Sequence, residues 1–193
     1  MNKFYTFDSF RFFRAWIANP LQVASVVPSS NSLSKVITCE ISIATGSVIE
    51  LGPGTGVFTR ALLQRGVPEE DIVLVENATE FVDSLRSNFP AALILEMDAV
   101  NLRGNRVPNE LQAGAVVSGL PFMSMSSRKI WAILSGAFQK LHVDGALYLF
   151  TYGFFCPIPK RFLDRLGLKA TRIGGTFANF PPAVVYRIRR HTS

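Results

Sequence analysis

Short runs of consecutive apolar residues alternate with segments of helical periodicity along most of the chain. Five of these runs, at 47–51, 72–76, 93–97, 115–118 and 146–152, are expected to be strands. Strands that are apolar throughout are buried on both faces, which is typical of parallel sheets covered by helices. Two more expected strands, 169–173 and 183–189, are only about ten residues apart, too close for a helical crossover, and should pair antiparallel. The sequence therefore predicts an α/β fold with a mostly parallel seven-stranded sheet, a C-terminal antiparallel hairpin and N-terminal helices.

The segments between these runs predict helices, and the helices divide the chain into two parts. Helices are expected at 8–19, from about residue 30 to Gly46, at 57–65, 79–88 and 160–166, and around 130–141. We assign residues 1–46 to N-terminal helices and residues 47–193 to the core domain. The two cysteines, Cys39 and Cys156, are far apart in the sequence and are not part of any cysteine or histidine cluster. This excludes a disulfide scaffold and a structural zinc site, and we expect no metal.

Positive charge is concentrated near the C-terminus. Residues 153–193 hold eight basic residues and one acid, a net charge of +7, which leaves −1 for residues 1–152. Such a patch indicates an anionic partner, such as phospholipid or nucleic acid, or else a solvated face that keeps the chain soluble. Residues 15–34 are uncharged but too polar to span a membrane, and we expect no secretory signal.

A glycine-rich turn follows the first expected strand. The order Gly52, Gly54, Gly56 reads GxGxG, which is neither the GxGxxG of dinucleotide-binding folds nor a phosphate-binding P-loop. Glycines let a backbone approach a ligand closely, and the following helix N-terminus favours an anionic group. Glu50, just before the turn, would repel a pyrophosphate but tolerates a ligand that carries an amino group and a sulfonium.

Two more acids end neighbouring strands. Glu76 ends the second strand, where a carboxylate can accept both hydroxyls of a ribose. Asp98 follows the third strand, where it can receive the amino group of an adenine. Ligands of open α/β sheets bind at the carboxyl ends of the strands, so these acids and the glycine turn should share one site.

With these motifs, residues 47–189 resemble the class I S-adenosylmethionine-dependent methyltransferases, which have a Rossmann-like fold. The likeness implies S-adenosylmethionine as cofactor. It implies that Glu50 and the glycines hold the methionine part, Glu76 the ribose, and Asp98 with Ala99 the adenine. It also assigns Ser29, Ser30, Asn77 and Ser118 to the cofactor site.

The loop after the fourth strand, Ser118-Gly119-Leu120-Pro121-Phe122, is similar to the acceptor loop of amine methyltransferases such as the rRNA adenine dimethylases. Those enzymes have asparagine where this chain has Gly119, and they continue into an RNA-binding domain for which no residues remain here. The chain resembles the bacterial phospholipid N-methyltransferases more closely. Three stretches carry that resemblance: 13–20 with 27–30, the acceptor loop, and 179–183.

This resemblance implies transfer of a methyl group to the amine of phosphatidylethanolamine, toward phosphatidylcholine. Desolvation in an apolar pocket lowers the pKa of the amine, so no dedicated base is needed. Backbone carbonyls at Ser118, Gly119 and Leu120 could align the amine. Phe122 or Tyr152 could face the developing cation, and Tyr152 could instead relay a proton or simply line the pocket.

The first expected helix places Phe12, Phe13 and Trp16 on one side and arginines on the other. A short aromatic, basic helix is typical of an interfacial membrane anchor, although such a stripe can also pack on a core. In either case it is expected to cover the acceptor pocket. Lys160, Arg161 and Arg187 are candidates to bind a lipid phosphate, and the resemblance adds Asn179 to the substrate residues.

Together these features predict a cytoplasmic enzyme bound peripherally to an anionic inner-membrane surface, with a phospholipid substrate and no nucleic acid. Two alternatives remain. The chain could methylate RNA, at adenine N6, or a small soluble amine with the same fold. It could also be a catalytically silent cofactor-binding or membrane-association module.

Overall fold

A computed structural model describes residues 27–104, 107, 111–176 and 182–191, with side chains from residue 31 onward. Its centre is a seven-stranded sheet in the order β3-β2-β1-β4-β5-β7-β6. The strands are β1 (Val48–Leu51), β2 (Ile72–Glu76), β3 (Leu93–Glu96), β4 (Ala113–Ser118), β5 (Leu141–Thr151), β6 (Leu168–Thr176) and β7 (Ala183–Arg190). Strands β1 to β5 are parallel, and β7 is antiparallel to both β5 and β6. The predicted sheet and its C-terminal hairpin are confirmed.

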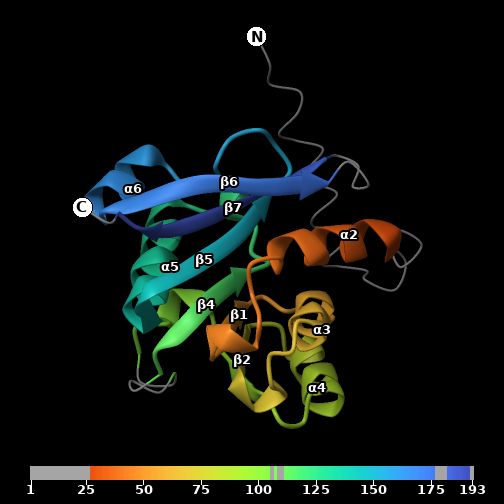
Figure 1. Ribbon diagram of the computed structural model, residues 1–193. Helices are drawn as coiled ribbons and strands as arrows, with labels where there is room; N and C mark the ends of the chain where they lie inside the picture. The colour runs from red at the N-terminus through yellow and green to blue at the C-terminus, as the bar shows by residue number, and fades with distance from the viewer. Residues whose placement is uncertain (1–26, 105–106, 108–110, 177–181, 192–193) are drawn as a thin grey trace.

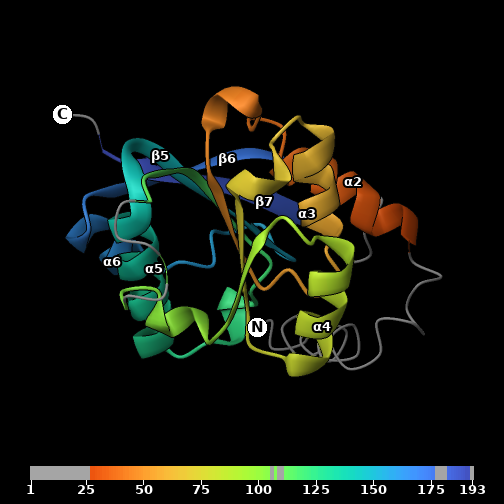
Figure 2. The ribbon, with the colours of Figure 1, turned by 90° about the horizontal axis from the view of Figure 1, so that it is seen from below.

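Helices cover both faces of the sheet (Figures 1 and 2). On one side lie α2 (Val27–Ile37), α3 (Val57–Gln64) and α4 (Thr79–Asn88), and on the other lies α5 (Ser127–Lys140). The short helix α6 (Lys160–Arg165) follows β5, and 3-10 turns η2 to η5 occupy Ile43–Thr45, Glu69–Asp71, Ala99–Asn101 and Phe122–Ser124. Three layers of this kind are the usual way to bury strands that are apolar on both faces.

Successive residues of the central strands supply two separate cores. Val48 and Val117 pack with the side chains of α2, α3 and α4, whereas Ile49 and Val116 pack with those of α5. All four residues of β1 are buried. This burial explains why the central strands read as continuous apolar runs in the sequence.

Two elements differ most from their predicted bounds. The helix expected from about residue 30 to Gly46 begins at Val27 and ends at Ile37, and a separate 3-10 turn, η2, follows it. Ser42 explains the break, because its side chain caps η2 and thereby starts a new element. Strand β5 begins at Leu141, earlier than expected, because the exposed residues 142–144 hide its first part from an apolar pattern.

The expected N-terminal helix at 8–19 lies outside the described residues. No helix in the described part of the chain is long and apolar enough to cross a membrane.

Candidate cofactor and acceptor site

The order of the strands reverses between β1 and β4. Both strands are parallel, and their last residues, Leu51 and Ser118, are register partners. Crossover connections leave this point in opposite directions, so the loops that follow the two strands diverge and create a place for a ligand. The glycine turn and the acceptor loop are these two loops, as the sequence predicted.

The glycine turn is built from left-handed backbone. Gly52, Gly54 and Gly56 have φ angles of 69°, 54° and 79°, a region that residues with a Cβ rarely adopt. A Cβ on Gly56 would lie 2.5 Å from the Phe89 ring, whereas a Cβ on Gly54 would meet nothing within 4 Å. The turn is therefore closed by packing at Gly56 and open at Gly54, where a ligand can approach the backbone.

Glu50 is fully buried in β1 and is only half satisfied. Its Oε2 accepts a hydrogen bond of 2.7 Å from Thr59 Oγ1. Its Oε1 is the single buried side-chain oxygen or nitrogen without a hydrogen-bond partner among the described residues. Burial raises the pKa of Glu50 to about 8, a rise that the Thr59 hydrogen bond and Arg60 oppose and that Glu76 reinforces. An unpaired buried carboxyl oxygen beside an open glycine turn fits a cationic amino group, which would supply the missing donor and favour the ionised form.

Glu76, at the end of β2, is by contrast well satisfied. Its Oε2 accepts from the Gly54 backbone N–H at 3.0 Å, and its Oε1 accepts from the N–H groups of Asn77 and Ala78 at 2.8 and 2.9 Å. A carboxylate has about four acceptor positions, so roughly one remains for a ligand hydroxyl. The Asn77 side chain is exposed, and this residue contributes its backbone to the arrangement. Glu76 thus links the end of the second strand to the glycine turn.

Asp98 follows β3 and caps η4. Its Oδ1 accepts from the Val100 N–H at 3.0 Å, and its Oδ2 lies 3.6 Å from Lys129 Nζ, a contact in which both side chains are partly exposed. Ala99, next in the chain, is buried. One carboxyl oxygen therefore shapes the turn, and the other faces an ammonium that a ligand amino group would have to replace or share.

The acceptor loop interlocks with the glycine turn. The Gly119 N–H donates to the Leu51 carbonyl at 2.9 Å, and Ser118 Oγ accepts from the Leu120 N–H at 3.2 Å. A Cβ on Gly119 would lie 2.7 Å from the Gly52 carbonyl oxygen, and a Cβ on Gly52 would lie 2.8 Å from Leu120 Cδ2. This close approach leaves no room for a side chain at position 119.

The aromatic candidates differ in exposure. Phe122 belongs to the core that packs on α5 and is 2% exposed. Tyr152 is half-buried just beyond β5 and forms an edge contact with Phe150, with ring centroids 5.4 Å apart. Of the two, Tyr152 is thus the more accessible to a substrate at this edge of the sheet.

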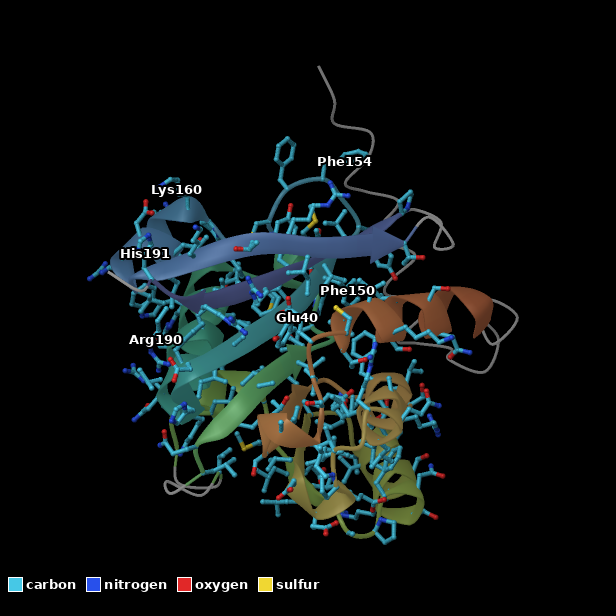
Figure 3. All side chains as sticks on the ribbon, viewed as in Figure 1. Glu40, Phe150, Phe154, Lys160, Arg190 and His191 are labelled. Atoms are coloured by element: carbon cyan, nitrogen blue, oxygen red, sulfur yellow. The ribbon has the colours of Figure 1, made fainter. Side chains whose placement is uncertain are left out.

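The three candidate phosphate-binding cations do not lie together in the structure. Lys160 Nζ pairs with Asp164 on α6 at 2.7 Å, and Arg161 donates to Ser127 Oγ at 3.1 Å. Arg187 pairs with Glu40 at 2.8 Å, in the middle of β7. Lys160 and Glu40 lie well apart (Figure 3), so Arg187 forms no cluster with the two residues of α6.

Several predicted residues lie where nothing can be said of their side chains. Ser29 and Ser30 belong to the first turn of α2, of which only the backbone is described. Phe12, Phe13, Trp16 and Asn179 lie outside the described residues. Within the described part of the chain, no group of three or more His, Cys, Asp or Glu side chains could hold a metal ion.

Sequence reasoning missed three members of this region: Thr59, Lys129 and Met123. Thr59 carried a signal, because it is a polar residue on the apolar side of α3, and such a residue must find a partner. Lys129 carried none, since a lysine in the first turn of a helix is ordinary. Met123 lies in η5, and the hydrogen bond of 3.0 Å from Thr151 Oγ1 to its sulfur depends on tertiary structure alone.

No protein-family model matches the chain. Among curated proteins, it is 31% identical over 122 residues to an ornithine lipid N-methyltransferase of Singulisphaera acidiphila. The match covers 61% of this chain and 64% of that protein, so the chain spans less than two thirds of the length of its relative.

Solved structures match over more of the chain but at lower identity. A glycopeptide N-methyltransferase, MtfA, superposes with a TM-score of 0.64 at 13% identity, over 83% of this chain and 90% of its own. A Burkholderia thailandensis 1,6-didemethyltoxoflavin N1-methyltransferase with bound S-adenosylhomocysteine gives 0.65 at 10%, over 94% and 87%. The Synechocystis magnesium protoporphyrin IX methyltransferase with bound S-adenosylmethionine gives 0.64 at 14%, over 97% and 93%. The chain therefore has the Rossmann-like fold of the class I methyltransferases, as its glycine turn and strand-end acids predicted.

Proposed function

We propose that this protein is an S-adenosylmethionine-dependent N-methyltransferase that acts on the primary amine of a membrane lipid, with phosphatidylethanolamine as the first candidate. It would work at the cytoplasmic face of the inner membrane. The observation that carries the proposal is the unpaired, buried oxygen of Glu50 beside the open glycine turn. The fold supports the cofactor, and the similarity to an ornithine lipid N-methyltransferase supports a lipid amine.

Each strand-end acid would bind a different part of the cofactor. Glu50 and the open turn at Gly54 would hold the amino-acid part, because the cationic amine satisfies Glu50 Oε1. The remaining acceptor position of Glu76 would take a ribose hydroxyl, and Asp98 Oδ2 would take the adenine amino group. Bound in this way, S-adenosylmethionine supplies an electrophilic methyl group on a sulfonium.

The acceptor loop positions the substrate amine and does not need to take its proton. Residues 118–122 contain no group that titrates near neutral pH. A lipid ammonium resembles a lysine, whose pKa is about 10.4, and it must lose a proton before it can attack. Transfer to an apolar environment lowers that pKa, so the ammonium gives its proton to solvent as it enters the pocket. The rate then depends on holding nitrogen, methyl and sulfur in line.

The three predicted phosphate-binding cations do not form a single pocket. Arg187 is paired with Glu40 and lies apart from Lys160 and Arg161 on α6 (Figure 3). The named relative is an ornithine lipid N-methyltransferase, and we therefore propose ornithine lipid as the second candidate substrate.

The test is methyl transfer to defined acceptors. Purified protein and methyl-labelled S-adenosylmethionine are incubated with anionic vesicles that contain phosphatidylethanolamine, with vesicles that contain ornithine lipid, or with total RNA. We expect label in one or both lipids and none in RNA. Label only in RNA would refute the lipid proposal. Label in ornithine lipid alone would replace the first candidate with the second.

The interlocked loops give an independent test. Gly119→Ala should lower kcat/KM at least tenfold, because its Cβ would force the acceptor loop away from the Gly52 carbonyl. Gly153→Ala is the matched control, since a Cβ there makes only an ordinary contact of 3.8 Å with Thr151. Equal activity of the two variants would show that the close approach does not position the acceptor.

A further inference from the structure

Two adjacent phenylalanines have the most exposed large apolar side chains of the described residues. Phe154 is 75% exposed and Phe155 is 86% exposed. Both lie in the loop 152–159 between β5 and α6, which arches above β6 (Figure 1). Leaving two such side chains in water forgoes the stabilisation that their burial would give. An exposed apolar cluster of this kind indicates an interaction site.

The fold itself keeps these rings outside. Tyr186 Oη donates a hydrogen bond of 2.8 Å to the Phe154 carbonyl and so fixes the backbone at the first ring. The chain is buried again at Ile158, between two prolines, and at Thr151 on the other side. The rings could turn inward only if these contacts were broken.

The exposed pair lies near the acceptor loop. Loop 152–159 leaves the carboxyl end of β5, beside the carboxyl end of β4, from which the acceptor loop starts. Met123 connects them: its sulfur accepts the Thr151 hydrogen bond, and its side chain is itself 59% exposed. Exposed apolar side chains from two loops therefore flank the edge of the sheet where the substrate amine would enter.

Positive charge surrounds this edge. The first turn of α5 carries Arg128 and Lys129, and α6 begins with Lys160 and Arg161. The Arg161 guanidinium donates to Ser127 Oγ, which brings the two helix starts together. Only two carboxylates, Asp98 and Asp164, pair with these four cations among the described residues.

We propose that loop 152–159 docks the protein on an anionic lipid bilayer, with Phe154 and Phe155 inserted at the interface and the cations of α5 and α6 facing lipid headgroups. Aromatic side chains beside basic residues suit the apolar and anionic layers of such a surface. Docking at this edge turns the acceptor loop toward the membrane. The choice of a lipid surface as partner rests on the proposed function.

Vesicle sedimentation of the full chain tests the docking surface. Wild type, Phe154→Ser/Phe155→Ser and the control Val143→Ser are compared on vesicles with and without anionic phosphatidylglycerol. Val143 is 64% exposed but lies at the opposite end of β5. The double variant should bind anionic vesicles at least tenfold more weakly than wild type, and the control should bind within twofold. Equal binding of the double variant and wild type, or equal loss in the control, would overturn the proposal.

A second variant tests membrane insertion by a fluorescence signal that appears on binding, and not by a loss of binding. In Phe155→Trp, anionic vesicles should shift the tryptophan emission to the blue, and brominated lipid should quench it, relative to wild type. An unchanged spectrum would place the side chain outside the bilayer and overturn the proposal. So would dimerisation of wild type that the double substitution abolishes, because the pair would then serve a second copy of the chain.

Cofactor titration separates the two proposals. The double variant should bind S-adenosylmethionine as wild type does, which shows that it is folded. Vesicle binding that depends on the two rings, without methyl transfer to any lipid, would support the docking surface and refute the proposed function.

Discussion

Glu50 and Glu76 are buried carboxylates at the same edge of the sheet, on neighbouring parallel strands, yet their surroundings differ. Glu50 accepts one hydrogen bond and leaves one oxygen unpaired, whereas Glu76 accepts three from backbone N–H groups. The first is poised to bind a cation, and the second holds the glycine turn in place. A position at a strand end therefore does not define the role of an acid; the donors around it do.

The largest expected effect is on cofactor affinity in Glu50→Gln. The amide keeps the size of the side chain and an acceptor for Thr59 but cannot carry the charge that pairs with an amino group. We expect S-adenosylmethionine to bind at least 100-fold more weakly by isothermal titration, since losing a buried charge pair costs about 3 kcal/mol or more. Circular dichroism should show an intact fold. Affinity within threefold of wild type would remove Glu50 from the cofactor site.

The same carboxyl should make the stability of the cofactor-free protein depend on pH. Burial raises the pKa of Glu50 from its ordinary value of 4.5 to about 8 in the folded protein. The folded state thus keeps a proton that the unfolded state loses, and this contribution to stability is lost as pH rises from about 4.5 through 8. Urea unfolding should show a decrease on the order of 2–4 kcal/mol over this window. Glu50→Gln should flatten that part of the profile; matching profiles in the two proteins would refute the raised pKa.

Glu76→Gln should act on stability more than on charge. One of the two oxygens becomes an NH2 group that faces backbone N–H donors, so at least one hydrogen bond is lost. We expect the free energy of unfolding in urea to fall by about 1–3 kcal/mol and cofactor affinity to fall about tenfold. Glu96→Gln, at the exposed end of the adjacent strand, is the control: its amide oxygen can still accept the hydrogen bond from Thr79 Oγ1, so stability should change by less than about 0.5 kcal/mol. An unchanged free energy of unfolding in Glu76→Gln would show that Glu76 does not hold the glycine turn in place.

The smallest effect is expected at Lys129. Its contact with Asp98 is 3.6 Å long and both side chains are partly exposed, so the pair contributes less than about 1 kcal/mol. Lys129→Ala should change the affinity for S-adenosylmethionine by less than threefold in a titration, whereas Asp98→Asn should weaken it about tenfold. If the lysine variant lost more than the asparagine variant, Lys129 and not Asp98 would be the residue that contacts the cofactor.

Local sequence patterns predicted the first and last residues of some elements correctly. Strand β2 and helix α4 have the predicted bounds, because a continuous apolar run and a helical run before a proline define them without reference to the rest of the chain. Helix α2 and strand β5 were misplaced. The chain after α2 forms a separate 3-10 turn that Ser42 caps, and β5 begins at Leu141, which pairs with Ala113 of β4, while the Arg190 side chain donates to the carbonyl of the polar residue His142.

For the candidate site, the sequence by itself determined which residues share one edge of the sheet. Parallel strands align their carboxyl ends, so three strand-end acids and a GxGxG turn had to meet there. Only the tertiary structure decided how each acid is used. One donor to Glu76 is the N–H of Gly54, 22 positions earlier in the chain, the unpaired oxygen of Glu50 results from complete burial, and Gly119 is fixed by a carbonyl 67 positions earlier in the chain, that of Gly52. Such contacts join segments far apart in sequence, and no local pattern encodes them.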